Sequence, residues 1–143
     1  MRVSTKGRYA LRLMLDIARN SDSGFVPLRD IAQRQGISMK YLEQIVSQLC
    51  RAGYLKSVRG PQGGYKLARP ERTYTAGDIL RVTEGDLCPV ACAGEEAEKC
   101  ARFTTCEMAR FWAGLRRAID SYVDGVTLED LKNMSCEAEA DGR

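Results

Sequence analysis

Residues 28–51 carry the pattern that most constrains the fold of this chain. Two short amphipathic segments are separated by a turn that contains Gly36, a residue type that commonly ends helices. Apolar residues recur in both segments at the three- and four-residue steps of a helix, and Ser38 is a good N-cap for the second. Two helices joined by such a turn predict a helix-turn-helix, in which the second helix enters the major groove of DNA.

A glycine-rich hairpin is predicted directly after this pattern. Two short strand-like segments, 54–58 and 65–68, flank residues 59–64, which hold three Gly and one Pro. A helix-turn-helix followed by a basic hairpin is typical of a winged helix. Residues 4–20 have helical periodicity and precede it. We therefore predict a mainly α fold in which residues 1–74 form a winged helix-turn-helix DNA-binding domain with a small β-hairpin wing.

The second half of the chain predicts helices separated by a loop. A capping-box pattern at Thr75 opens a short helix that reaches about Glu84, residues 85–103 are loop-like, and a long helix is expected over 104–124. Another short helix is expected from Thr127. We take residues 75–135 as the loop and dimerisation helices, and residues 136–143 as a flexible tail.

The long helix carries more large apolar side chains than a solvent-exposed helix normally does. We expect antiparallel packing against the same helix of a second copy, giving a twofold homodimer. Packing of this helix back onto its own winged helix is the alternative. The residues expected in the dimer contact are Phe111, Trp112, Leu115, Ile119 and Tyr122.

The net charge of +3 hides an asymmetry between the two halves. Residues 1–70 contain 13 Lys or Arg and 4 Asp or Glu, whereas residues 71–143 contain 9 and 15. A basic half joined to an acidic half indicates a polyanionic partner for the first, unless the clustering is by chance. No apolar run approaches the ~20 residues of a membrane-spanning helix. The chain also begins without a secretion-signal pattern, so we expect a cytoplasmic protein that binds no membrane.

The residues expected to contact an operator in double-stranded DNA lie on three elements. On the third predicted helix, a glutamine can pair with adenine and a glutamate can accept from a cytosine amino group. A wing arginine suits a narrow minor groove, and basic residues near the N-terminus suit phosphates. An ordinary solvated helix face and a surface arginine are the alternatives. The candidates are Arg2, Lys6, Arg8, Tyr9, Ser38, Lys40, Tyr41, Glu43, Gln44, Arg59 and Gly60.

Four of the six cysteines crowd into the pattern Cys88-x3-Cys92-x7-Cys100-x5-Cys106, where x is any residue. Thiolates favour zinc and iron–sulfur clusters, and the paired CxxC hooks usual for zinc are absent. The wide, glycine-containing spacing favours a cluster, while structural zinc and unliganded thiols stay open. An enzyme of thiol redox chemistry is not expected, because there is neither CxxC nor His. Cys50 is expected to be a small core residue, and Cys136 has no assigned role.

The chain resembles the IscR-like winged-helix regulators, the family often labelled Rrf2, in three segments: residues 1–10, 37–44 and 58–65. Within that family the IscR pattern is nearest, and NsrR and CymR are relatives. The resemblance extends to about Leu131. It implies a homodimer with a long dimerisation helix, and DNA contacts at Glu43, Gln44 and Arg59. It also implies an iron–sulfur cluster, of two-iron or four-iron type, held in the loop before that helix by Cys92, Cys100 and Cys106.

One departure from the IscR pattern concerns the fourth ligand. The IscR pattern has a His as fourth ligand three residues after the last cysteine, whereas here Ala109 occupies that position and the chain has no His. Cys88, Asp86, Glu107 or a carboxylate of the other subunit are candidates, and a small thiol or an open site would also fit.

The sequence thus predicts a dimeric transcription regulator, a repressor, that senses iron–sulfur or redox status. Its expected targets are genes of iron–sulfur cluster assembly or of cysteine and sulfur metabolism. A CymR-like or zinc-stabilised regulator without a cluster, and an NsrR-like repressor that responds to nitric oxide, are the alternatives.

Overall fold

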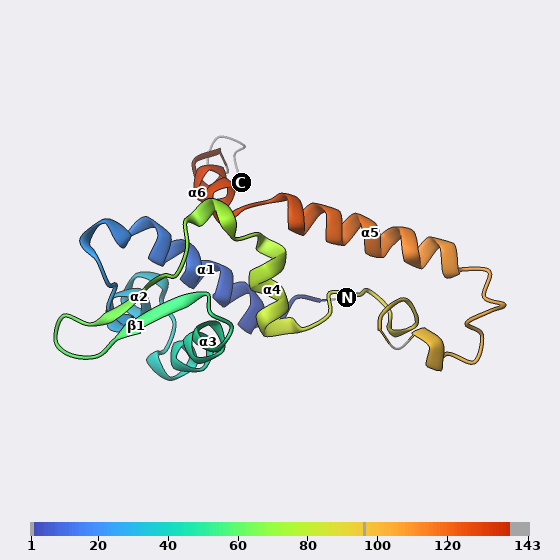
Figure 1. Ribbon diagram of the computed structural model, residues 1–143, viewed down its shortest axis with the longest axis horizontal. Helices are drawn as coiled ribbons and strands as arrows, with labels where there is room; N and C mark the ends of the chain where they lie inside the picture. Colours follow the sequence, from blue (N-terminus) through green and yellow to red (C-terminus); the bar gives the residue numbers. More distant parts are fainter. Residues whose placement is uncertain (1, 96, 138–143) are drawn as a thin grey trace.

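The computed structural model describes residues 2–95 and 97–137, which form a helical head and a projecting arm (Figure 1). We call α1 to α4, the hairpin and α6 the head, and residues 85–125 the arm. The helices are α1 (Thr5–Arg19), α2 (Leu28–Gln35), α3 (Met39–Arg51), α4 (Ala76–Glu84), α5 (Ala109–Gly125) and α6 (Leu128–Glu137), and the strands are β1 (Leu55–Val58) and β2 (Gly64–Leu67).

The head contains one hydrophobic core built around α1. The Ser4 hydroxyl caps this helix by accepting from the backbone N–H of Gly7 at 3.2 Å. Helix α1 packs against α2, α3, α4 and α6, and each of these helices contributes to the core. The largest fully buried side chains are Tyr74, Leu13, Met14, Ile17, Ile31, Leu42, Ile45, Leu49, Ile79 and Leu128.

The helix-turn-helix predicted from the sequence is confirmed. Gly36 ends α2 in the left-handed conformation with φ 65°, which only glycine adopts without strain. Ser38 then caps α3, its hydroxyl accepting from the backbone N–H of Tyr41 at 3.2 Å. The polar start of α3 is therefore fixed by the turn that the sequence pattern predicted.

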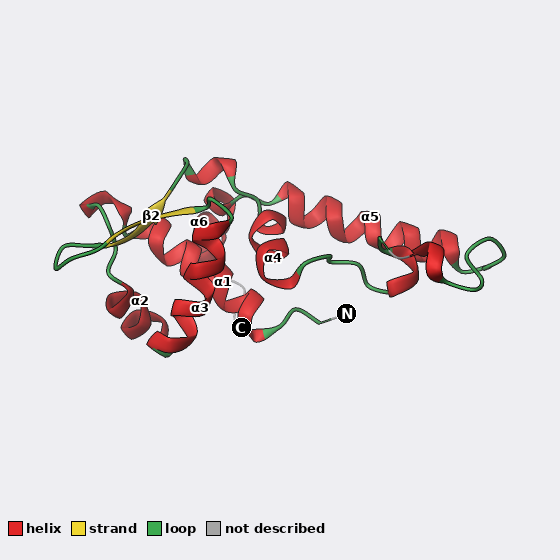
Figure 2. Ribbon diagram, turned by 60° about the horizontal axis from the view of Figure 1, so that its bottom comes forward, coloured by secondary structure: helices red, strands yellow, loops and turns green. Residues whose placement is uncertain are grey.

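The predicted wing is confirmed as a two-stranded antiparallel hairpin, which lies at the end of the head opposite to the arm (Figure 2). Leu55 pairs with Leu67, and Val58 pairs with Gly64. Backbone hydrogen bonds of 2.8 and 2.9 Å between Val26 and Tyr65 join the hairpin to the segment before α2. The fold is thus a mainly α winged helix-turn-helix.

Helix α6 returns the chain from the arm to the head. The Ala76 N–H donates to the Val126 carbonyl at 2.8 Å, and the Leu128 N–H donates to the Tyr74 carbonyl at 2.9 Å. Leu128 is fully buried in the head core. The final helix runs to Glu137, two residues into the expected tail, and the rest of that tail lies outside the described residues.

The arm differs from the prediction at one boundary. The long helix begins at Ala109, so the predicted start at Thr104 is wrong. Before it, the N–H of Phe103 donates to the Cys100 carbonyl at 3.1 Å and the N–H of Thr105 to the Arg102 carbonyl at 3.0 Å. These i→i+3 bonds close separate turns, and two adjacent β-branched threonines disfavour helix continuation. Among the described residues, no helix is long and apolar enough to span a membrane.

Candidate DNA-reading surface and cysteine cavity

The polar start of α3 projects from the head. Lys40, Glu43 and Gln44 are exposed, and Ser38 lies at the cap. Tyr41 is half-buried because its ring packs edge-on against Tyr9 of α1, with 5.5 Å between ring centroids. The structure therefore brings Tyr9 to α3 and leaves the predicted base-reading side chains accessible.

A groove of about 490 Å³ separates the start of α2, the start of α3 and the wing. Arg59 and Gly60 at the wing tip are exposed and line it, as do the exposed apolar side chains of Met39 and Val58. Arg29, which the sequence analysis missed, also lines this groove with a side chain that is 78% exposed. Only the tertiary fold places Arg29 opposite the wing, so the sequence pattern held no signal for it.

The predicted basic anchors lie at the start of α1. Arg2 and Arg8 are exposed, and Lys6 is half-buried. Ser4 beside them donates to the Glu84 carboxylate, which joins the start of α1 to the end of α4. Arg8 directly precedes Tyr9 in α1, and its guanidinium donates to the Thr5 hydroxyl at 3.1 Å.

A buried carboxylate fixes the helix-turn-helix against α1. Asp16 is 4% exposed and accepts from Arg34 at 2.6 and 3.1 Å and from Gln35 Nε2 at 2.8 Å. The hydrogen bond to Asp16 raises the pKa of Arg34 above its ordinary value, although desolvation opposes the rise. Only the aspartate of this ion pair is buried, since the Arg34 side chain is 39% exposed, and removal of Arg34 would leave the Asp16 carboxylate with one fewer partner. The sequence signal was an aspartate beside Ile17 on an otherwise apolar helix face, and the sequence analysis did not use it.

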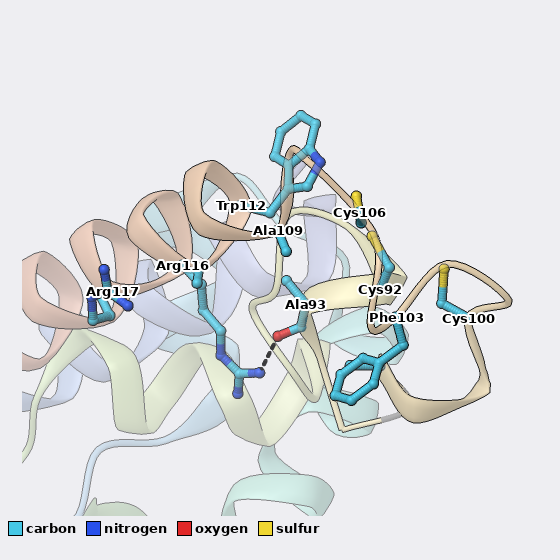
Figure 3. Close-up of a pocket in the computed structure, with 11 residues that line it drawn as sticks. Cys92, Ala93, Cys100, Phe103, Cys106, Ala109, Trp112, Arg116 and Arg117 are labelled. Carbon is cyan, nitrogen blue, oxygen red and sulfur yellow. Dashed lines mark hydrogen bonds between the residues drawn. The ribbon is translucent and has the colours of Figure 1, made fainter.

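The arm gathers three of the predicted ligands around one cavity. Cys92, Cys100 and Cys106 all line a space of about 360 Å³ between the loop and the start of α5, which we call the cysteine cavity. Figure 3 shows the thiols arriving from separate turns of the loop. Cys92 is exposed and the other two are half-buried. The remaining walls are mostly apolar, with two arginines: Ala93, Ala97, Phe103, Ala109, Trp112, Ala113, Arg116 and Arg117.

The candidates for a fourth ligand do not line this cavity. Asp86 accepts from the Cys88 N–H at 3.2 Å and lies 3.6 Å from Arg116, while the Cys88 thiol donates to the Val90 carbonyl at 3.0 Å. Glu107 is exposed and lines a separate hollow beside Cys106. Within the described residues, no group of three or more His, Cys, Asp or Glu side chains is arranged to hold a single metal ion.

Cys50, the cysteine assigned to the core, packs half-buried against the head core at the end of α3. Burial raises the pKa of its thiol above the ordinary value. It is therefore separate in both place and environment from the cysteines of the arm.

Helix α5 carries an uncovered apolar stripe. Phe111 is 56% exposed, Leu115 37% and Tyr122 69%, and Trp112 packs against the Phe111 ring at 4.9 Å between centroids. Ile119 is half-buried. Near its C-terminal end the helix meets α4 of the head, where Arg81 forms ion pairs with Asp120 and Asp124.

Comparison with known proteins identifies the family. The family model described as Rrf2, iron-dependent transcriptional regulator, matches residues 3–134. The chain belongs to the Rrf2 family. The resemblance predicted from the sequence is thereby confirmed. The Rrf2 relatives are named as transcriptional regulators, so this chain is a DNA-binding transcription regulator and not an enzyme.

Several relatives are similar over nearly the whole chain. The regulator IscR of Aliivibrio salmonicida is 40% identical over 131 residues, covering 92% of this chain and 77% of the relative. IscR of Klebsiella pneumoniae is 37% identical, covering 100% and 86%. Among solved structures, T. potens IscR has a TM-score of 0.78 at 40% identity, covering 96% and 90%. CymR of B. subtilis, described as its global cysteine regulator, has a TM-score of 0.76 at 40% identity, covering 94% and 98%.

Proposed function

We propose that this Rrf2 regulator is a dimeric repressor that senses iron–sulfur or redox status through a cluster bound by Cys92, Cys100 and Cys106. The observation that carries the proposal is that these thiols line one cavity directly before α5. The repressor would act in the cytoplasm, where thiols stay reduced and available as ligands. Its proposed targets are genes of iron–sulfur cluster assembly or of cysteine and sulfur metabolism.

The residues of the cysteine cavity fit an iron–sulfur cluster of two-iron or four-iron type. Thiolates are the usual ligands of such clusters, and three of them line this one cavity. A structural zinc ion needs four ligands about 2.3 Å away, which requires tighter convergence than a multi-iron cluster does. The three thiols come from separate turns of the loop, a spacing that favours the larger group. When bound, the cluster would supply sensitivity to iron supply and to oxidants.

A fourth cluster ligand from this chain would require one of the candidate side chains to move toward the cysteine cavity. Asp86 and Cys88 would have to leave the hydrogen bonds they now make, and Glu107 would have to turn from its own hollow. A carboxylate from a second copy or a small thiol could occupy the position instead. With Ala109 in place of a fixed histidine, the fourth position is exchangeable, which suits a sensor of oxidants or nitric oxide.

The apolar stripe of α5 supports the homodimer. Leu115 and Tyr122 are seven residues apart, two helical turns, and Phe111 lies one turn before Leu115. Exposed large apolar side chains in a row need a partner surface, and the same stripe on a second copy is self-complementary about a twofold axis. A twofold dimer presents two copies of α3 to the two half-sites of an operator. The proposed DNA contacts are Arg2, Lys6, Tyr9, Ser38, Lys40, Tyr41, Glu43, Gln44, Arg59 and Gly60.

The connection of the arm to both helices supplies a route for the signal. The loop joins α4 at Gly85 and α5 at Ala109, so a change in loop conformation acts on the contact between head and dimer helix. Ligand-dependent ordering of such a loop is a two-state element that can bias the spacing of the reading helices.

Operator affinity with and without a cluster tests this proposal. An operator selected from random DNA by the purified protein is titrated anaerobically, before and after reconstitution with iron and sulfide. Reconstitution should change the affinity of the wild type and of the control variant Cys50→Ser by at least tenfold. Cys100→Ser should not respond. Equal affinity of the wild type in both states would overturn the proposal.

The similarity to CymR favours one alternative, a regulator whose DNA binding depends on a protein partner and needs no cluster. Two further alternatives keep the same DNA-binding head: a regulator stabilised by zinc, and an NsrR-like repressor that responds to nitric oxide. Elemental analysis of the protein distinguishes bound zinc from bound iron. Operator affinity after nitric oxide is added to the reconstituted protein tests the NsrR-like alternative.

A further inference from the structure

One arginine of α5 contacts both ends of a short segment in the loop. Arg116 Nη1 donates to the Ala93 carbonyl at 2.6 Å (Figure 3). Its Nη2 lies 3.6 Å from Asp86 Oδ1, and its Nε lies 3.5 Å from Asp120 Oδ2 one turn further along α5. The side chain is 33% exposed, so these contacts are partly shielded from water.

The segment that Arg116 contacts, residues 86–94, folds back on itself. Asp86 Oδ1 accepts from the Cys88 N–H at 3.2 Å, and Asp86 Oδ2 lies so close to Gly94 that a Cβ there would be 2.8 Å away. The N–H groups of Ala93 and Gly94 each close a turn at 3.1 Å. Both ends of the segment therefore meet at Asp86, where Arg116 binds.

We propose that Arg116 is a positioning residue that docks segment 86–94 onto α5 and thereby fixes Cys92 relative to Cys106. Ala93, which accepts from Arg116, directly follows Cys92, whereas Cys106 stands just before α5. The docking rests on these contacts alone. Its role in holding a cluster rests on the proposed function.

The ion pair between Arg116 and Asp120 links the docked segment to the head. Asp120 is shared, since Arg81 Nη2 of α4 also donates to its Oδ1 at 3.0 Å, and Arg81 Nη1 donates to Asp124 at 2.6 Å. Hydrogen bonds to Asp124 and Asp120 raise the pKa of Arg81 well above its ordinary value. Arg116 therefore stands between the loop and a network of ion pairs that already joins α4 to α5.

Hydrogen exchange of the cluster-free, full-length protein tests the docking directly. Arg116→Gln should speed exchange of the amides in segment 86–94 at least tenfold, because its turns lose their anchor. Arg116→Lys keeps one donor and should be intermediate. The matched control is Arg117→Gln, since Arg117 lines the same cavity but makes no hydrogen bond or ion pair with the described residues. Helical circular dichroism checks that α5 stays folded. Unchanged exchange in Arg116→Gln would overturn the docking.

Iron release then tests the role toward the cluster. Anaerobically reconstituted wild type, Arg116→Gln and Arg117→Gln are mixed with a ferrous chelator, and we expect several-fold faster release from Arg116→Gln alone. Equal release from all three would overturn the role of Arg116 in holding the cluster. If the wild type takes up no cluster, the proposed function fails, while the exchange result still decides the docking.

Discussion

The head and the arm of this molecule are stabilised in different ways. In the head, each helix contributes side chains to a core shielded from water, and the polar groups of the helix-turn-helix are paired through Asp16. In the arm, none of the described residues of α5 is buried, and large apolar side chains face solvent. The difference shows that the head buries its large apolar side chains within one chain, whereas the arm leaves large apolar side chains and the Cys92 thiol exposed.

The largest expected effect is on folding of the head. Leu42→Ala removes a fully buried side chain, and we expect it to lower the free energy of unfolding by about 2–5 kcal/mol. Leu115→Ala in the arm should cost less than about 1 kcal/mol in the monomer, because that side chain is already exposed. Urea denaturation at a protein concentration too low for dimers measures both. Equal decreases in the free energy of unfolding for the two variants would contradict this difference between head and arm.

The next effect concerns the stripe on α5. A charge introduced by Leu115→Glu should weaken the dimer at least tenfold, about 1.4 kcal/mol, because a buried carboxylate would have no partner. Ser121→Glu places the same charge on another face of α5 and serves as the control. Analytical ultracentrifugation gives the dissociation constants. A dimer that tolerates Leu115→Glu would show that the stripe is not the interface.

Substitutions on the reading surface should affect DNA binding and leave folding intact. Gln44→Ala should relax the preference at one base pair and cost about 1–3 kcal/mol. Arg59→Ala should weaken binding and, if Arg59 contacts a phosphate, reduce the slope of log affinity against log salt by about 1. Arg102→Ala in the arm is the charge-matched control. If neither head variant changes affinity, the assigned surface is wrong.

The smallest expected effect is a difference in alkylation rate between a cysteine of the head and a cysteine of the arm. Burial raises the pKa of Cys50, so less of its thiol is ionised at neutral pH, and alkylation should be several-fold slower than at exposed Cys92. Because the pKa is raised, the rate at Cys50 should keep increasing at alkaline pH after that of an ordinary thiol has levelled off. Peptide mass spectrometry after timed alkylation reads both sites, and equal rates would contradict this environment for Cys50.

Local signals in the sequence predicted most of the head. Gly36 and Ser38 specify the turn through their own backbone and cap chemistry, and the hairpin tip does the same for the wing. The start of α5 was missed because the i→i+3 turns before Ala109 leave no periodic trace that separates them from the first turn of a helix. Short-range patterns therefore locate elements better than their boundaries.

The candidate site could be predicted only in part. The cysteine spacing identified Cys92, Cys100 and Cys106, which the fold brings to one cavity. Arg29 at the groove and Arg116 at the loop were missed, because each acts across elements that are distant in sequence. Contacts of this kind depend on tertiary packing and have no spacing rule.

The most direct test of the proposed cluster is the iron and sulfide content, with the visible spectrum, of protein purified and reconstituted without oxygen. The wild type should be brown, with iron and sulfide bound, and Cys100→Ser should lose both colour and iron. A colourless wild type that takes up no iron, or that holds one zinc ion per chain instead, would contradict a cluster-based sensor.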